Sequence, residues 1–123
     1  GLLVLAGIVW LIVTPGKASK YDAFAQCIKN KATVTFFGAF WCPHCQAEKA
    51  RFGASAKYLP YVECSTPDGQ HQTQVCIDNG IKTYPTWQFA TGTTPTATST
   101  YRHEGEMELV DLAEATQCPL PQQ

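Results

Sequence analysis

The sequence predicts a single α/β domain in which a mixed central sheet carries helices on both faces. Helical and strand-like patterns alternate along most of the chain, and the last two strand-like segments follow each other directly. Alternation of this kind is typical of a sheet covered by helices on its two faces. A buried strand that ends at a Cys-x-x-Cys pair, where a helix begins, marks the centre of the arrangement. At 123 residues the chain is long enough for one hydrophobic core.

Four segments have helical patterns. In the first of them, Phe24, Ala25 and Ile28 recur at helical spacing and define one apolar face. Gly53 and Gly80 follow the second and third helices, as expected because glycine is favoured just beyond a helix C-terminus. The expected helices cover residues 21–30, 46–52, 70–79 and 106–116.

Four other segments have the composition of strands. The first is rich in β-branched and aromatic residues and is expected at the centre of the sheet. The third begins with the dipeptide Tyr84-Pro85, and a threonine-rich loop with Gly92 and Pro95 separates it from the fourth. The expected strands cover residues 33–40, 61–64, 84–89 and 98–103.

The pentapeptide Trp41-Cys42-Pro43-His44-Cys45 lies between the central strand and the second helix. Cys42 is expected at the helix N-cap, where unpaired N–H groups and the helix dipole stabilise a thiolate nucleophile. Pro43 suits the first turn because its missing N–H would have no partner there. Cys45 follows one turn later on the same face. Cys42 can therefore attack a disulfide, and Cys45 can resolve the mixed disulfide that forms.

The six cysteines favour an oxidising compartment. A turn at residues 67–69 can bring Cys64 and Cys76 together, so we expect a disulfide there, either structural or electron-relaying, with free core thiols as the alternative. Cys27 and Cys118 flank the domain and are a second possible pair, with unpaired burial as the alternative. A second metal-binding half would have to accompany the Cys-x-x-Cys pair in a zinc ribbon, but Cys64 and Cys76 are too far apart in the sequence to supply it. We therefore expect no metal site. A net charge of −1 gives no electrostatic case for nucleic-acid binding.

Residues 1–13 are apolar and uncharged, but a bilayer-spanning helix needs about 20 residues. The segment is expected to be the distal part of a transmembrane helix; a signal-peptide core and an ordinary buried helix are the alternatives. The expected organisation is an apolar membrane segment at 1–14, a linker at 15–20, the α/β domain at 21–118 and a loose tail at 119–123.

The motif at 41–45, together with Tyr84-Pro85-Thr86, resembles the thioredoxin superfamily and implies a thioredoxin-like sandwich. A narrower resemblance is to the thioredoxin-like domain fused to bacterial and plant homologues of vitamin K epoxide reductase. It is carried by residues 38–45, Lys49, residues 52–53, residues 61–64, Cys76 and residues 84–87. This resemblance covers about residues 20–118.

The resemblance implies a thiol–disulfide oxidoreductase that acts on cysteine-containing proteins and is reoxidised by a quinone-linked membrane partner of the vitamin K epoxide reductase type. It implies a cis bond before Pro85, facing the cysteines, and a substrate groove beside Trp41, Tyr84 and Thr86. The domain itself is expected to bind no cofactor, with quinone used only by the partner. The implied location is membrane-anchored and extracytoplasmic: periplasm, cell exterior or thylakoid lumen.

Reducing thioredoxins carry a buried Asp on the central strand, and spacing from Cys42 places Phe36 at that position. Glu48 and Glu63 are candidate replacements for that base. A protonated His44 would stabilise the Cys42 thiolate and make the disulfide more oxidising. These features favour an oxidase. The alternatives are a membrane-anchored reductase and a non-catalytic, membrane-tethered domain that holds peptides near Pro85.

Overall fold

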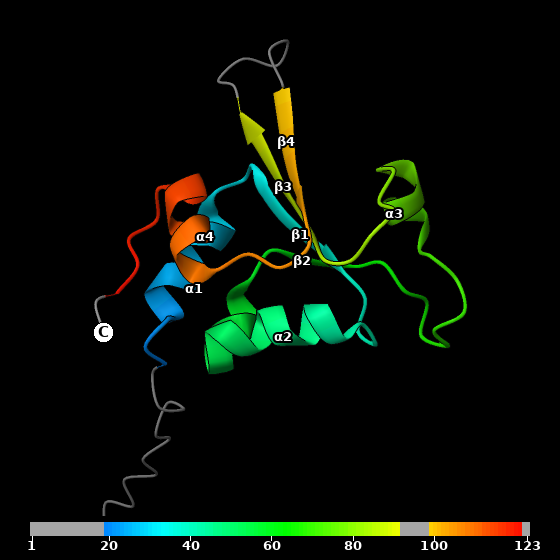
Figure 1. Cartoon of the computed structure of the whole chain (residues 1–123), viewed down its shortest axis with the longest axis horizontal. Helices are drawn as coiled ribbons and strands as arrows, with labels where there is room; N and C mark the ends of the chain where they lie inside the picture. The colour runs from blue at the N-terminus through cyan, green and yellow to red at the C-terminus, as the bar shows by residue number, and fades with distance from the viewer. Residues whose placement is uncertain (1–18, 92–98, 122–123) are drawn as a thin grey trace, which may run out of the picture.

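The computed structural model describes residues 19–91 and 99–121. They form a four-stranded sheet in the order β2-β1-β3-β4 (Figure 1). The central strand β1 (Val34–Gly38) pairs in parallel with β2 (Tyr61–Glu63) and antiparallel with β3 (Thr86–Thr91). β3 also pairs antiparallel with β4 (Ser99–Glu104). The predicted α/β fold with a mixed sheet is therefore confirmed.

The helices surround this sheet. They are α1 (Asp22–Asn30), α2 (Pro43–Phe52), the 3₁₀ helix η1 (Gly53–Tyr58), α3 (Gln74–Asp78) and α4 (Leu109–Thr116). Figure 1 shows α1 and α4 next to each other, with α3 on the opposite side of the strands. The disulfide between Cys27 of α1 and Cys118, just beyond α4, joins the first of these helices to the end of the described chain.

The alternation of side chains along β1 divides the core between two faces of the sheet. Phe36 points into the larger cluster, where it stacks on Trp87 of β3 with ring centroids 4.5 Å apart. Residues of α1, α2 and α4 complete this cluster. Phe37 belongs to a smaller cluster that contains Cys64 and Cys76. The Cys-x-x-Cys motif follows β1, so both clusters fix the strand that positions it.

The main differences from the predicted elements concern the third helix and the chain after Gly53; the fourth helix also begins at Leu109 rather than at residue 106. The third helix is shorter than 70–79, because residues 70–73 form a turn in which Gln72 pairs with Ser65 and the N–H of Thr73 donates to the Cys64 carbonyl. The chain also continues past Gly53 as η1, which ends where Leu59 begins the link to β2. Gly53 has a positive φ of 57°, so it breaks the α-helix, but the next residues coil again.

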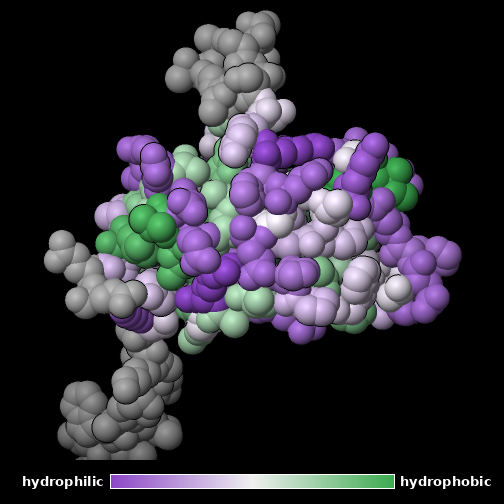
Figure 2. Space-filling model, in the orientation of Figure 1, coloured by the Kyte–Doolittle hydropathy of each residue, from purple (hydrophilic) through white to green (hydrophobic). Residues whose placement is uncertain are grey.

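The predicted apolar membrane segment and linker at 1–20 lie almost wholly outside the described residues. Across residues 19–91 and 99–121, none of the helices has the length and apolar character needed to span a bilayer. On the face drawn in Figure 2, hydrophilic residues predominate and hydrophobic ones appear in small separate patches.

Candidate functional site

Cys42 and Cys45 lie where the sequence motif predicts a helix to begin. Cys42 is the N-cap of α2 with an extended backbone, and Pro43 is the first helical residue. The Cys42 carbonyl accepts the N–H of Gln46 at 3.0 Å, which starts the helical hydrogen bonds. Both cysteines are free thiols in this structure, and Cys42 is 7% exposed and Cys45 1% exposed. The N-terminal cysteine is therefore the more accessible of the two sulfurs.

The bond between Tyr84 and Pro85 is cis, and this turn faces the motif. The Cys42 thiol donates to the Tyr84 carbonyl, with sulfur and oxygen 3.6 Å apart. The Trp41 ring packs edge-on against Tyr84 with centroids 5.9 Å apart, and its indole N–H donates to the Ser65 hydroxyl at 2.9 Å. Trp41 nevertheless remains 48% exposed, so it forms an apolar wall beside Cys42.

Thr86 occupies a different environment from the rest of the expected groove. Its side chain is buried, and its hydroxyl donates to the Thr83 carbonyl at 2.7 Å. Thr86 begins β3 and pairs with Phe37 of β1. This side chain therefore holds the turn before β3 rather than lining an open surface.

Cys45 lies in an environment that keeps its thiol protonated. Burial is the main cause, and a hydrogen bond to Cys42 adds to it; together they raise the pKa of Cys45 to about 12. A backbone hydrogen bond from Ala39 and the charge of Lys49 oppose this rise. A thiol of this kind reacts only after a nearby group removes its proton.

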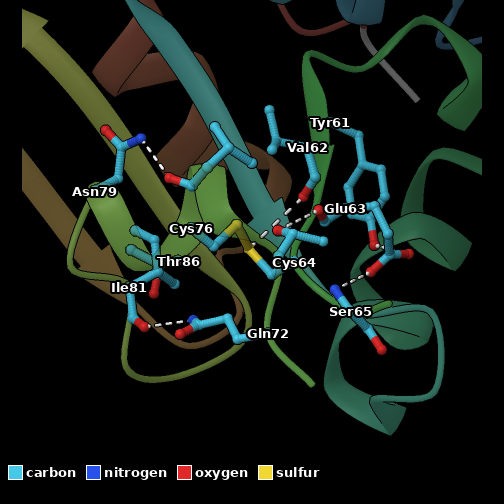
Figure 3. The surroundings of a disulfide bond; sticks show 12 residues. Tyr61, Val62, Glu63, Cys64, Ser65, Gln72, Cys76, Asn79, Ile81 and Thr86 are labelled. Atoms are coloured by element: carbon cyan, nitrogen blue, oxygen red, sulfur yellow. Dashed lines mark hydrogen bonds between the residues drawn. A yellow bond between two sulfur atoms is a disulfide. The ribbon is translucent and has the colours of Figure 1, made fainter. Parts of the chain in front are cut away.

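Tyr61 of β2 approaches Cys45 from the neighbouring strand, and Glu63 of the same strand contacts Tyr61. The Tyr61 hydroxyl donates to Glu63 Oε1 at 3.0 Å, and the Lys49 ammonium lies 3.6 Å from the centroid of the Tyr61 ring. Figure 3 shows Tyr61, Glu63 and Ser65 together beside the bridge between Cys64 and Cys76. Burial, followed by the hydrogen bond to Glu63, raises the pKa of Tyr61 well above its usual range, so its hydroxyl keeps its proton.

His44 is part of a separate charged network on the other side of α2. Its Nδ1 lies 2.8 Å from Glu106 Oε2, and Arg51 Nη1 lies 3.0 Å from Glu106 Oε1. Arg51 also pairs with Glu48 and with Glu108, the latter at 3.3 Å. The contact with His44 lowers the pKa of Glu106, so its carboxylate remains ionised beside the motif.

Glu48 is the fully buried end of that network. Its Oε1 accepts the Trp87 indole N–H at 2.6 Å and the Met107 backbone N–H at 2.8 Å. Burial raises the pKa of Glu48, although these donors and Arg51 oppose the rise. Its polar partners belong to β3, α2 and the segment before α4, and neither cysteine is among them.

The remaining four cysteines form two disulfides. Cys64, directly after β2, and Cys76 of α3 are joined across 12 residues, and both are fully buried. Cys27 and Cys118 join across 91 residues. Neither pair offers a thiolate to a metal. In the part of the chain that the structure describes, no three His, Cys, Asp or Glu side chains cluster closely enough to hold one.

The sequence motif led directly to Cys42, Cys45 and Pro85, but it gave no role to Tyr61 or Glu106. The only signal for Tyr61 was Gly38 on β1, whose missing side chain leaves space beside the neighbouring strand. Glu106 lies 62 residues from His44 along the chain, and no local pattern connects them.

Comparisons with known proteins agree with this geometry. Over 98 residues the chain is 38% identical to the thiol-disulfide oxidoreductase LTO1 of Arabidopsis thaliana, which covers 76% of the chain and 23% of that protein. It is 31% identical over 83 residues to the thioredoxin domain-containing protein 5 homolog of Drosophila melanogaster, covering 60% of the chain and 19% of that protein. The chain thus spans less than a quarter of the length of either relative. Their names support a disulfide oxidoreductase.

The fold has a counterpart among solved structures. Chloroplastic thioredoxin z superposes with a TM-score of 0.52 at 16% identity, covering 76% of this chain and 84% of that one. The thioredoxin family model matches residues 16–115, which include both cysteines of the motif, the cis proline and all four strands. The chain therefore belongs to the thioredoxin family.

Proposed function

We propose that this domain is a thiol–disulfide oxidoreductase that oxidises cysteine-containing proteins through Cys42 and Cys45. The observation that carries the proposal is the pair of free, adjacent thiols at the N-terminus of α2, opposite the Tyr84-Pro85 turn. The more accessible sulfur belongs to Cys42, and the more buried one belongs to Cys45. This difference fits one attacking and one resolving cysteine.

In the proposed reaction, a substrate thiolate attacks Cys42 in the oxidised domain, and Cys45 leaves as a thiolate that takes up a proton. A second substrate thiolate then attacks the mixed disulfide and releases Cys42. The substrate gains a disulfide, and the domain gains two electrons and becomes a dithiol. The apolar wall formed by Trp41 and Tyr84 would contact the substrate chain near Cys42.

Two features support oxidation as the direction. Phe36 fills the position at which reducing thioredoxins carry an Asp, and it is fully buried against the Trp87 ring. His44 lies inside the motif, where its protonated form would stabilise the Cys42 thiolate and hence the reduced domain. The Glu106 carboxylate lies 2.8 Å from His44 and holds the imidazole beside the motif.

The partner that reoxidises the domain follows from the resemblance to domains fused to vitamin K epoxide reductase homologues. We propose a quinone-linked membrane protein of that type, with the quinone bound by the partner.

The two disulfides, Cys27–Cys118 and Cys64–Cys76, support an extracytoplasmic location. Membrane attachment through residues 1–14 is part of the same proposal. Because the sulfurs of Cys64 and Cys76 belong to fully buried residues, we assign that bridge a structural role rather than a relay.

The redox potential of the Cys42–Cys45 couple tests the direction. Equilibration with glutathione buffers should give a potential less reducing than the roughly −270 mV of thioredoxin. His44→Ala should lower the potential, because it removes a charge that stabilises the thiolate. His71→Ala is the matched control, since His71 is exposed and its backbone contacts Thr66 rather than the motif. A potential at or below that of thioredoxin, unmoved by His44→Ala, would contradict the oxidase and favour the membrane-anchored reductase.

A further inference from the structure

We propose that Tyr61 and Glu63 form a proton relay that serves Cys45 during disulfide exchange. The proposal depends on the exchange between Cys42 and Cys45, but not on its direction, because the proton that Cys45 loses in one direction it regains in the other. Tyr61 would carry the proton, and Glu63 would hold it.

The geometry around Gly38 places Tyr61 beside the Cys45 sulfur. A side-chain Cβ built on Gly38 would lie 2.9 Å from Cys45 Sγ, 2.8 Å from Tyr61 Cε2 and 3.4 Å from the Tyr61 hydroxyl oxygen. The Cys45 sulfur and the Tyr61 hydroxyl therefore both border the small space next to Gly38 of β1. Parallel pairing of β1 with β2 produces this arrangement, because Phe36 lies opposite Tyr61 and Gly38 lies opposite Glu63.

The Glu63 carboxylate is positioned to accept a proton from the Tyr61 hydroxyl. Its Oε1 accepts the Tyr61 hydroxyl at 3.0 Å, while its Oε2 accepts the backbone N–H groups of Ser65 at 3.0 Å and Phe40 at 3.2 Å. Hydrogen bonds from these three donors fix the orientation of the Glu63 carboxylate. Glu63 is half-buried, so it can also exchange its proton with water. Figure 3 shows the hydrogen-bonded contacts of this carboxylate with Tyr61 and Ser65.

The chemistry of Cys45 requires such a group. In the dithiol state the pKa of Cys45 is about 12, so the thiol is almost wholly protonated near neutral pH, and burial, the largest cause of the rise, does not depend on Cys42. In the reduced domain Cys42 can share the proton of Cys45. Once Cys42 is bound to a partner in a mixed disulfide, its sulfur is no longer a thiolate, and another acceptor is needed.

The proposed step balances within the domain and its partner. Once the Cys45 thiol turns into hydrogen-bond reach of the Tyr61 hydroxyl, the Cys45 proton passes to the Tyr61 oxygen as the Tyr61 proton passes to Glu63, so Tyr61 never carries a charge. The Cys45 sulfur then forms a bond with Cys42, and the bond between Cys42 and the partner's sulfur breaks. The electron pair leaves with the partner as a thiolate. Reversal of the same steps returns the proton to Cys45.

Other charged groups around Cys45 act on it differently. Lys49 of α2 covers the Tyr61 ring, and its charge stabilises the Cys45 thiolate without accepting a proton. Cys42 raises the pKa of Cys45 through their mutual hydrogen bond. Tyr61 on β2 is coupled electrostatically to Cys45, and Glu63 reaches this pair through its hydrogen bond with the Tyr61 hydroxyl.

A single-turnover experiment separates the two cysteines. The reduced domain is mixed with an aromatic disulfide that releases a coloured thiolate. Attack by Cys42 releases the first equivalent, and attack by Cys45 on the mixed disulfide releases the second. Tyr61→Phe and Glu63→Gln should each slow the second release by roughly tenfold or more near neutral pH, while the first keeps its rate. Tyr58→Phe is the matched control, because Tyr58 is also half-buried, packs against the same core and has a lysine near its ring. Unlike Tyr61, it is not among the side chains nearest to Gly38 beside the Cys45 sulfur.

The pH profile distinguishes a relay from a packing effect. Without the relay, the second release in Tyr61→Phe should depend on the thiolate fraction of Cys45 and rise about tenfold per pH unit, whereas the wild type should rise less steeply. The difference between the second-release rates of the wild type and Tyr61→Phe should therefore become small at alkaline pH. Equal second-release rates, parallel pH profiles, or equal slowing of both releases would overturn the relay. A wild-type domain that releases only one equivalent would instead overturn the exchange between Cys42 and Cys45.

Discussion

Glu48 and Glu63 are both glutamates near α2, the helix that carries the Cys-x-x-Cys pair, but they have opposite surroundings. Glu48 is fully buried and bound by Trp87, Met107 and Arg51. Glu63 is half-buried and bound to the Tyr61 hydroxyl, which lies beside the sulfur of Cys45.

The difference shows that burial alone does not make a carboxylate a base. A general base must reach the proton that it removes, either directly or through a hydrogen-bonded group. Glu48 has a raised pKa, which is a common mark of catalytic carboxylates, yet its hydrogen bonds join α2 to β3 and to the segment before α4. We therefore expect substitutions at Glu48 to change stability and substitutions around Glu63 to change the chemistry of Cys45.

The largest expected effect is on stability at Glu48. Glu48→Ala leaves the buried N–H groups of Trp87 and Met107 without an acceptor, at about 1–3 kcal/mol each. Together with the cavity, the free energy of unfolding should fall by about 4 kcal/mol, measured by urea denaturation. Glu108→Ala is the control, because Glu108 also contacts Arg51 but is 69% exposed, and it should lose less than about 0.5 kcal/mol. Similar losses in the two variants would contradict a structural role for Glu48.

Most of the fold could be predicted from the sequence, because apolar periodicity and punctuation by glycine and proline are local signals. The strand before the motif and the helix after it are examples. The shortened α3 could not be predicted, since residues 70–73 are held by hydrogen bonds to Cys64 and to Ser65, on the far side of a turn. The 3₁₀ helix after Gly53 was missed for a related reason. A glycine at a helix end predicts a stop but does not determine the path that follows.

Some residues of the candidate site could likewise be predicted from the sequence, and others could not. Cys42 and Cys45 occur in a five-residue motif, so spacing alone indicates their chemistry. The choice between Glu48 and Glu63 depends instead on which strands flank β1 and on their register. That register places Tyr61 opposite Phe36 and Glu63 opposite Gly38, and the sequence carries no direct sign of it.

A smaller effect on stability, with a specific effect on chemistry, is expected at Gly38. In Gly38→Ala the new methyl group would lie within 2.9 Å of both Tyr61 and Cys45, so the two side chains must separate. Overpacking of this kind should cost about 2 kcal/mol, and the second thiolate release should slow while the first is retained. Gly53→Ala is the control: its φ of 57° makes the substitution destabilising, but no atom lies within 4 Å of the new methyl group. Slowing of the second release in both variants would mean that lost stability, not the separation of Tyr61 from Cys45, is the cause.

The smallest expected effect is the pH dependence of the contribution of Glu48 to stability. Burial raises the pKa of Glu48 in the folded state above the value of about 4.3 expected in the unfolded chain. The folded state therefore binds this proton more tightly than the unfolded state does. The resulting stabilisation is complete below the unfolded pKa and is lost as the pH rises through the folded pKa.

Glu48→Gln lacks this titration but keeps an oxygen that can accept the Trp87 and Met107 N–H groups. Urea denaturation of both proteins from neutral pH down to about pH 4 should thus show the wild type gaining stability relative to Glu48→Gln on acidification. Titration of Glu106 and the other carboxylates acts on both proteins, so the difference between them isolates position 48. A difference that stays constant, or that shifts towards Glu48→Gln at low pH, would mean that Glu48 is held as firmly in its charged form as Glu106, and the contrast with Glu63 would then rest on position alone.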